Sequence, residues 1–168
     1  MPTLSDAEQL NAAVTLFERY VQMTVPPVLD ETATDFLKSY QIASTWIENT
    51  AYVVGDVILP TVRNGHCYRC TQAGTSETLA ADEPDWPTSA AAIATEGDSD
   101  PILTWQEAGP EPANLYNVRA AAHAAWLSKA AKASLSVDID QQVGGIKASQ
   151  VYDHCIAMAD KFSSLGIG

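Results

Sequence analysis

The sequence predicts an α+β protein, a four-helix bundle with a small antiparallel β-domain inserted between the second and third helices. Apolar residues recur at helical spacing near both ends of the chain. The middle of the chain is instead rich in β-branched residues and in turn-forming pairs such as Asn64-Gly65. We therefore expect the first half of the bundle at residues 1–45, the β-domain at 46–110, and the second half with a C-terminal tail at 111–168.

The composition is that of a globular protein. The chain has 168 residues, 46% hydrophobic and 18% charged, so a core can form without disulfides or a metal ion. The formal net charge of −12 repels phosphate, and the 9 Lys and Arg residues are scattered, which disfavours non-specific binding to nucleic acid. The start "MPTLSDAEQL" has no basic flank or apolar core, so it does not resemble a signal peptide. No apolar run is long enough to span a membrane. The three cysteines are an odd number, which does not suit a secreted disulfide scaffold. We expect no membrane contact and synthesis in a reducing cytoplasm.

The N-terminal part predicts two helices. The first runs from Ser5 to about Val21, with a capping box formed by Ser5 and Glu8. Pro26-Pro27 cannot continue a helix. The second helix is expected to begin near Asp30 or Thr32. Its apolar stripe is Phe36, Tyr40, Ala43 and Ile47.

The signals become typical of strands after Trp46. The stretch "AYVVGDVILP" is rich in β-branched residues, and Gly55-Asp56 predicts a turn or bulge within it. Asn64-Gly65 predicts a hairpin between "VILPTVR" and "HCYRCTQAG". Residues 74–101 are dense in Gly, Pro, Ser, Thr and Asp and predict a long loop, which a short strand at 102–109 follows.

The C-terminal part predicts two more helices. Pro112 suits the first turn of a third helix. That helix is rich in alanine and presents one face made of Leu115, Val118, Ala122 and Trp126. Residues 137–147 predict a connector or a small hairpin around Gly144-Gly145. The last helix starts near Ser149 and carries Val151, Cys155, Met158 and Phe162.

The segment "HCYRC" at 66–70 contains two cysteines and an adjacent histidine, which could form half of a metal site. A zinc site usually needs four ligands, but only one such pair is present, and the other candidates lie in the predicted helices: His123, His154 and Cys155. In a strand, Cys67 and Cys70 point to opposite faces because side chains alternate. The context of a thioredoxin-like redox pair is also absent. We expect a structural strand, with zinc binding and redox chemistry as the weaker alternatives.

Five aromatic residues belong to the predicted β-domain: Trp46, Tyr52, Tyr68, Trp86 and Trp105. We expect their rings to fill its core, because large aromatics dominate burial in a small domain, and we expect Trp86 among them to be partly exposed. The alternative is that they stack on sugar rings. No Gly-x-Ser-x-Gly, phosphate loop or HExxH motif occurs. We expect no catalytic residue, no metal site and no cofactor.

The stretches "ASTWIENTAYVVGDVILP", "NGHCYRCTQAGTSE", "EPDWP", "LTWQEAGP", "NLYNVRAAAHAAWLSKAAKAS" and "SQVYDHCIAMAD" follow one another from about Ala43 to Asp160. This order resembles the head–tail adaptor proteins of tailed bacteriophages, also called head completion or connector proteins, that carry a β-rich insert. The flanking helices carry the adaptor resemblance. The β segment alone is also similar to modules of other phage structural proteins and to small carbohydrate-binding modules.

The resemblance implies a non-enzymatic protein of the virion neck, made in the cytoplasm of the host bacterium. It implies a homo-oligomeric ring, usually of twelve copies, that docks under the portal protein and meets a tail-side connector, a stopper or tail terminator protein. DNA would pass through the central channel without specific binding, and part of the −12 charge would face that channel.

The C-terminal segment would reach toward the portal. The residues expected at that interface are Phe162, Leu165, Gly166, Ile167 and Gly168. The alternative function is a carbohydrate- or host-surface-binding phage tail protein. Its site would be formed by Trp86, Tyr68 and Trp105 of the insert.

Overall fold

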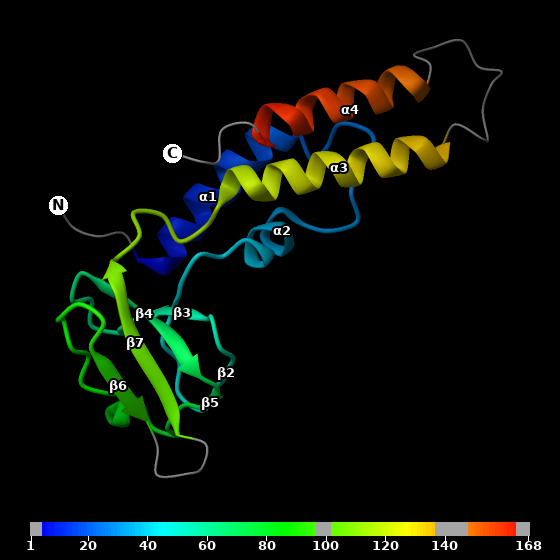
Figure 1. The fold of residues 1–168 in the computed structure, drawn as a ribbon. Coiled ribbons are helices and arrows are strands. Elements are labelled where there is room, and N and C mark those ends of the chain that lie inside the picture. The colour runs from blue at the N-terminus through cyan, green and yellow to red at the C-terminus, as the bar shows by residue number, and fades with distance from the viewer. Residues whose placement is uncertain (1–4, 97–101, 137–147, 164–168) are drawn as a thin grey trace. The chain divides into compact units, whose positions relative to one another are not determined.

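The structure is a computed structural model that describes residues 5–96, 102–136 and 148–163 (Figure 1). It contains four α-helices and a small, mostly antiparallel sheet, which confirms the α+β class. The chain divides into two compact units. We call Met1–Gln41 together with Tyr116–Gly168 the helical unit, and Ile42–Leu115 the β unit.

The first helix of the helical unit, α1 (Asp6–Val21), confirms the predicted capping box. The backbone N and Oγ of Ser5 donate to the Glu8 carboxylate, each at 2.8 Å, and the Glu8 N–H donates to Ser5 Oγ at 3.4 Å. Gln22 caps the C-terminal end of the helix, and its φ of 50° is left-handed. Ala13, Phe17 and Val21 form its buried face.

The second helix, α2 (Ala33–Ser39), is shorter than predicted. Thr32 is its N-cap and makes a capping box with Asp35. The prediction that its stripe continues through Ala43 and Ile47 is wrong, because both residues belong to the β unit. The β-branched Thr45 and its neighbour Ser44 pair with a strand instead of extending the helix.

The helices α3 (Val118–Ser136) and α4 (Ala148–Ser163) lie side by side (Figure 1). The predicted start at Pro112 is wrong: Asn117 precedes the helix, and its Oδ1 accepts from the Ala120 N–H at 3.0 Å. Leu115 therefore lies outside α3. The predicted start of α4 near Ser149 is confirmed, whereas the predicted connector at 137–147 lies outside the described residues.

The helices of the helical unit share apolar cores. One core joins α1, α2 and α3 and includes Phe17, whose ring stacks on Phe36 with centroids 5.7 Å apart. Another joins α3 to α4 and consists of Trp126, Ala130, Cys155 and Ala159. The alanines of α3 allow this close approach because their side chains are small. Among the described helices, none combines the length and the apolar character needed to cross a membrane.

The β unit contains a five-stranded sheet with the strand order β1-β3-β4-β7-β6. Among the strand pairs that the structure describes in this sheet, only β1 and β3 are parallel. These strands are β1 (Ser44–Thr45), β3 (Val57–Leu59), β4 (His66–Gln72), β6 (Ile93–Glu96) and β7 (Leu103–Pro110). A separate antiparallel pair is formed by β2 (Ala51–Tyr52) and β5 (Gly74–Thr75).

The predicted hairpin is confirmed, with a longer loop than the dipeptide requires. β3 pairs with β4 in the register Val57↔Arg69 and Ile58↔Tyr68, so residues 60–65 connect the strands. Gly65 has a φ of 83°, and Asn64 Oδ1 accepts from the His66 N–H at 3.0 Å, which fixes the end of the loop.

The prediction of one long loop at 74–101 is wrong for several described residues. The segment contains β5, a short 3-10 helix (η1, Ala80–Asp82) and β6. The β-branched Ile93 and Thr95 explain β6, which pairs along its length with β7. The predicted last strand is confirmed as β7.

One core cluster holds the β unit together. It consists of Trp46, Tyr52, Ile58, Tyr68, Cys70, Ala94, Leu103 and Trp105, with the half-buried Trp86 packed against it. The aromatic-core interpretation is therefore confirmed, including the partial exposure of Trp86.

Candidate functional site

The "HCYRC" segment lies in strand β4, as predicted. Cys70 belongs to the aromatic core, whereas Cys67 Sγ lies 3.6 Å from the carbonyl oxygens of both Gly109 and Pro110. The two thiols thus have different surroundings, which follows from the alternation of side chains along a strand.

Burial raises the pKa of both thiols, and the nearby Glu107 carboxylate adds to the effect at Cys67. A raised pKa favours the neutral thiol, while metal ligation and nucleophilic attack require the thiolate. Among the described residues, no group of three or more His, Cys, Asp and Glu side chains could hold a metal ion. The geometry gives β4 a structural role.

The carboxylate of Glu96 is buried in the β unit between two tryptophans. Its Oε1 accepts from Trp46 Nε1 at 2.9 Å and from Trp105 Nε1 at 2.5 Å, and its Oε2 accepts from the Glu77 N–H at 3.3 Å. Burial raises the pKa of this carboxyl, against the effect of the indole hydrogen bonds. These contacts join the end of β6 to Trp46 before β2, to Glu77 after β5 and to Trp105 in β7.

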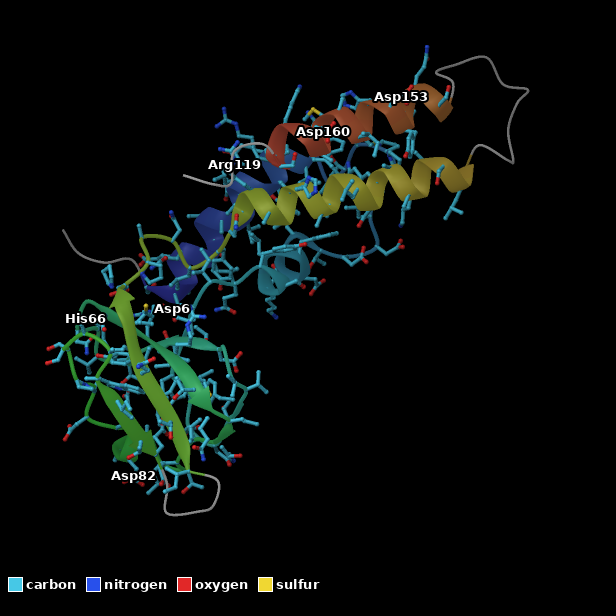
Figure 2. The ribbon with its side chains drawn as sticks, in the orientation of Figure 1. Asp6, His66, Asp82, Arg119, Asp153 and Asp160 are labelled. Carbon is cyan, nitrogen blue, oxygen red and sulfur yellow. The ribbon has the colours of Figure 1, made fainter. Side chains whose placement is uncertain are left out.

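A second buried carboxylate, that of Glu107, organises the opposite end of β7. Its Oε1 lies 2.9 Å from His66 Nδ1 and accepts from the Gly109 N–H at 2.9 Å, while its Oε2 accepts from the Ala91 N–H at 3.0 Å. The hydrogen bond from His66 is the main reason that the pKa of Glu107 lies below its usual value. Figure 2 shows His66 at this end of the sheet.

Trp86 is the aromatic residue of the β unit that solvent reaches. Its ring lies 4.6 Å from that of Tyr68 and 6.0 Å from that of Trp105, between centroids. Its Nε1 donates to Glu83 Oε1 at 2.8 Å, and Glu83 also accepts from the backbone N and Oγ1 of Thr61. These ring contacts and the Nε1 hydrogen bond position the Trp86 ring at the edge of the core.

The three residues of the carbohydrate-binding alternative are therefore not equivalent. Tyr68 and Trp105 have 0% of their surface exposed, so neither offers a ring face to a sugar. This corrects the expectation that both belong to a glycan site. Trp86 alone of the three reaches the surface.

In the helical unit, α3 anchors the segment that follows α1. Trp126 Nε1 donates to the Tyr20 carbonyl at 3.2 Å. The fully buried Lys129 donates through Nζ to the carbonyls of Gln22 and Val25, each at 2.8 Å. One helical turn on, Lys132 Nζ donates to the Val28 carbonyl at 3.1 Å and bonds to the Asp30 carboxylate at 2.6 Å.

These three donors recur every third residue of α3, so they lie along one side of the helix. They bind carbonyls at the C-terminal end of α1, those of Tyr20 and Gln22, and in the segment that follows it, those of Val25 and Val28. Burial lowers the pKa of Lys129, whose Nζ also lies 4.9 Å from the centroid of the Trp126 ring.

The two histidines of the helical unit have separate structural contacts. His123 Nδ1 lies 2.9 Å from the Ala159 carbonyl oxygen, and the His154 ring packs edge-on against Trp126 at 5.8 Å. Cys155 is buried, and burial raises the pKa of its thiol. No contact joins His154 to the thiol of Cys155 among the described interactions.

Of the residues expected at the portal interface, only Phe162 is described. Its half-buried ring packs against Tyr20 with centroids 5.1 Å apart and contacts both helical cores. Phe162 thus helps to hold α4 against α1. Leu165, Gly166, Ile167 and Gly168 lie outside the described residues.

The outer side of α4 carries exposed carboxylates. Asp153 and Asp160 are both exposed and are seven residues apart, so they project from the same side of the helix (Figure 2). On the same unit, α3 carries three basic residues and no acidic one: Arg119, Lys129 and Lys132.

Comparisons of the chain with protein-family models, with curated proteins and with solved structures found no match.

Sequence reasoning missed both buried carboxylates and the buried lysine. Glu96 directly follows the uncharged stretch "SAAAIAT", and its position beside two tryptophans depends on the pairing between β6 and β7. Lys129 stands in a stretch where most residues are alanine or another apolar residue, so a buried position could be expected from the sequence, but its carbonyl partners could not.

Proposed function

We propose that the protein is a structural component of a tailed-phage virion, a head–tail adaptor that forms a ring under the portal protein. In this proposal the four helices make one bundle, the β-domain is an insert in it, and the chain has no enzymatic activity. The ring has about twelve copies, as the family resemblance implies, and its other partner is a tail-side stopper or terminator protein.

The observation that carries the proposal is the way the chain builds the helical unit. Residues from both chain ends, 1–41 and 116–168, make one compact unit, and the β unit is inserted between them. This is the organisation that the resemblance implies for an adaptor with a β-rich insert. Cores that join α1, α2 and α3, and α3 with α4, support the single bundle.

One side of α3 supports contact with neighbouring copies. It carries no charge from one end to the other, and its residues, all at least partly exposed, are Ala120, Ala124, Leu127, Ala131 and Leu135. Leu127 and Leu135 are 43% and 75% exposed. An uncharged side with small residues lets a second helix approach closely, so we propose that α3 packs against the next copy in the ring.

The acidic charge supports passage of DNA through the ring. A channel lined by carboxylates repels phosphate and offers few contacts that release counter-ions. We propose that the exposed carboxylates of α4, those of Asp153 and Asp160, contribute to this lining. An inner wall with a strongly positive potential in an electron microscopy map of the ring would contradict this part of the proposal.

The deciding experiment is co-assembly with the portal protein of the same virion. We expect a ring–portal complex in light scattering after size exclusion and in electron microscopy, with the protein located in the neck of the virion. Leu127→Lys should prevent ring formation, because it places a charge on the uncharged side of α3. The matched control is Leu16→Lys on α1, where Leu16 is 37% exposed. Failure of the wild-type chain to bind portal would overturn the proposal.

A second candidate function is binding of a carbohydrate or host-surface glycan by the β unit. The observation in its favour is the partly exposed ring of Trp86, which a hydrogen bond to Glu83 holds in place, since an aromatic face in a fixed position suits stacking on a sugar. Binding on a glycan array that Trp86→Ala abolishes and Ile47→Ala preserves would favour it. Ile47 is a suitable control because it is 56% exposed in the same unit.

A further inference from the structure

The outer edge of β6 has no partner strand among the described residues, because β6 ends the strand order of the sheet (Figure 1). The opposite edge strand, β1, has only two residues. An unpaired edge presents a row of backbone N–H and C=O groups that another strand can satisfy, and natural proteins usually protect such edges with charges, proline or bulges. β6 is short and has one inward-pointing charge, Glu96, but its exposed side carries no charge, proline or bulge.

The direction of the free groups follows from the register with β7. The Ala92 carbonyl accepts from the Glu107 N–H at 2.8 Å, and Ala94 lies opposite Trp105. In an antiparallel pair, the backbone groups of alternate residues point to the same side. Ala92 and Ala94 therefore point toward β7, while the N–H and C=O groups of Ile93 and Thr95 point away from the sheet.

The side chains of this edge are apolar or neutral. Ile93 is 62% exposed, and Thr95 is exposed beside it. The only charged residue of β6, Glu96, is turned inward, where it accepts hydrogen bonds from two indoles. The carboxylate that would have repelled a second acidic chain is thus removed from the edge.

We propose that β6 pairs with β6 of a second copy of this chain, antiparallel and about a two-fold axis at Ala94. The inference does not rest on the adaptor function. Such an axis places Ile93 opposite Thr95 of the partner, and Thr95 opposite Ile93 of the partner. Each of these pairs exchanges two backbone hydrogen bonds, so the outward groups of both residues are satisfied.

The side chains fit the same register. Ile93 and Thr95 form cross-strand pairs of β-branched residues, which favour sheet pairing. At the axis the strands approach most closely, and the residue there is the small Ala94. A second copy is a better occupant than an unrelated strand, because one register satisfies both edges and closes the assembly at two chains.

The contact is small, so the pair is expected to be weak. A short strand pairing buries much less than the roughly 1,200 Å² of a standard interface. The net charge of −12 on each chain adds repulsion, which salt screens over about 8 Å at 0.15 M. The weight-average mass of the wild type should therefore rise toward two chains between about 10 μM and 1 mM protein, and more so as salt is added.

Charge exchange at the edge tests the register. The variant I93K/T95K places the lysine at position 93 of one copy opposite the lysine at position 95 of the other, and I93E/T95E places like negative charges there. Each variant alone should lose the β6 pairing of the wild type in sedimentation equilibrium. An equimolar mixture should form pairs at least as readily as the wild type, because every lysine then faces a glutamate.

Thr71→Lys and Thr71→Glu are the matched controls, since Thr71 is exposed on the central strand β4 of the same sheet. Both should associate like the wild type, and near-ultraviolet circular dichroism should show all variants folded. A wild type that stays a single chain at 1 mM, or Lys and Glu variants that associate like the wild type, would overturn the inference. A ring formed through the helical unit is indifferent to charges at 93 and 95, so the two proposals fail separately.

Discussion

At the scale of single residues, the β unit depends on a carboxylate that serves two tryptophans. The indole N–H groups of Trp46 and Trp105 are buried, and the sheet occupies most backbone carbonyls in its own ladder. Glu96 supplies the acceptor for both. A side chain that satisfies two buried donors at once contributes more than its own hydrogen bonds, because its loss leaves both donors without a partner.

Glu96→Ala should lower the free energy of unfolding by about 2–4 kcal/mol, since a buried donor without an acceptor costs about 1–3 kcal/mol. Glu96→Gln keeps an acceptor oxygen and should lose less. Tryptophan fluorescence during urea unfolding measures the change, because the β unit contains Trp46, Trp86 and Trp105. The control is Glu48→Ala, at an exposed position, and equal losses for the two variants would argue against the role of Glu96.

The same carboxyl makes stability depend on pH. Burial raises the pKa of Glu96 in the folded state, so between its ordinary pKa and the raised one the folded chain holds a proton that the unfolded chain has lost. Stability from this group is present below the ordinary pKa and is lost as pH rises through the raised value. Urea midpoints for the wild type should therefore fall across that window relative to Glu96→Gln. Parallel pH profiles would contradict this.

In the helical unit, Lys129 is a buried charged residue that satisfies two partners, as Glu96 does in the β unit. Its ammonium donates to the carbonyls of Gln22 and Val25. Lys129→Met keeps the apolar stem but removes the ammonium that donates to both carbonyls, and we expect the free energy of unfolding to fall by about 2–3 kcal/mol. Helical circular dichroism during urea unfolding measures it. Lys38→Met, at an exposed position of α2, should cost far less; a similar cost would mean that the carbonyl bonds do not matter.

At the scale of elements, α2 has only seven residues and depends on its cap. Thr32 Oγ1 donates to the Asp35 carboxylate at 2.7 Å and accepts from the Asp35 N–H at 3.2 Å. Thr32→Ala should lower stability by about 1 kcal/mol, the usual value of an N-cap. Thermal unfolding compared with the exposed Thr24→Ala measures this effect, and no difference between the two would show that packing alone holds α2.

Elements with a local signal were predictable from the sequence. The capping box of Ser5 and Glu8 located the start of α1, and the Asn64-Gly65 pair located the β3–β4 hairpin. Elements that depend on distant partners were not. The strand β6 lies in a stretch rich in turn-forming residues and exists because β7 pairs with it, and the end of α2 is set by the pairing of β1 with β3.

The site was less predictable than the fold. The exposure of Trp86 could be anticipated from its two flanking prolines, Pro84 and Pro87, in a turn-rich stretch. The sequence alone could not show whether Tyr68 and Trp105 are buried or exposed, because an aromatic residue in a strand can belong either to a core or to a binding face. Which side of each strand faces inward is decided by the register of the whole sheet.

At the scale of the whole molecule, each unit has its own core, and the β unit should fold alone. Residues 42–115 include the buried Ala43 and Leu115 and the hydrogen bond from the Ile42 N–H to the Leu115 carbonyl at 2.8 Å. A fragment 42–115 is expected to give a cooperative urea transition and near-ultraviolet dichroism like that of the full chain. The matched fragment 46–110 lacks those contacts and should be clearly less stable. Equal stability of the two fragments would contradict the boundary at 42 and 115.

The hydrogen bond between Ile42 and Leu115 has a consequence for engineering. Next to it in the chain, Gln41 forms an antiparallel bridge with Tyr116. The chain therefore leaves the helical unit at Gln41 and re-enters it at Tyr116, and these two residues already lie next to each other. A short turn that joins residue 41 directly to residue 116 should therefore give a helical unit that folds without the β unit. A foreign domain whose N- and C-termini lie close together should be tolerated as an insert at the same position.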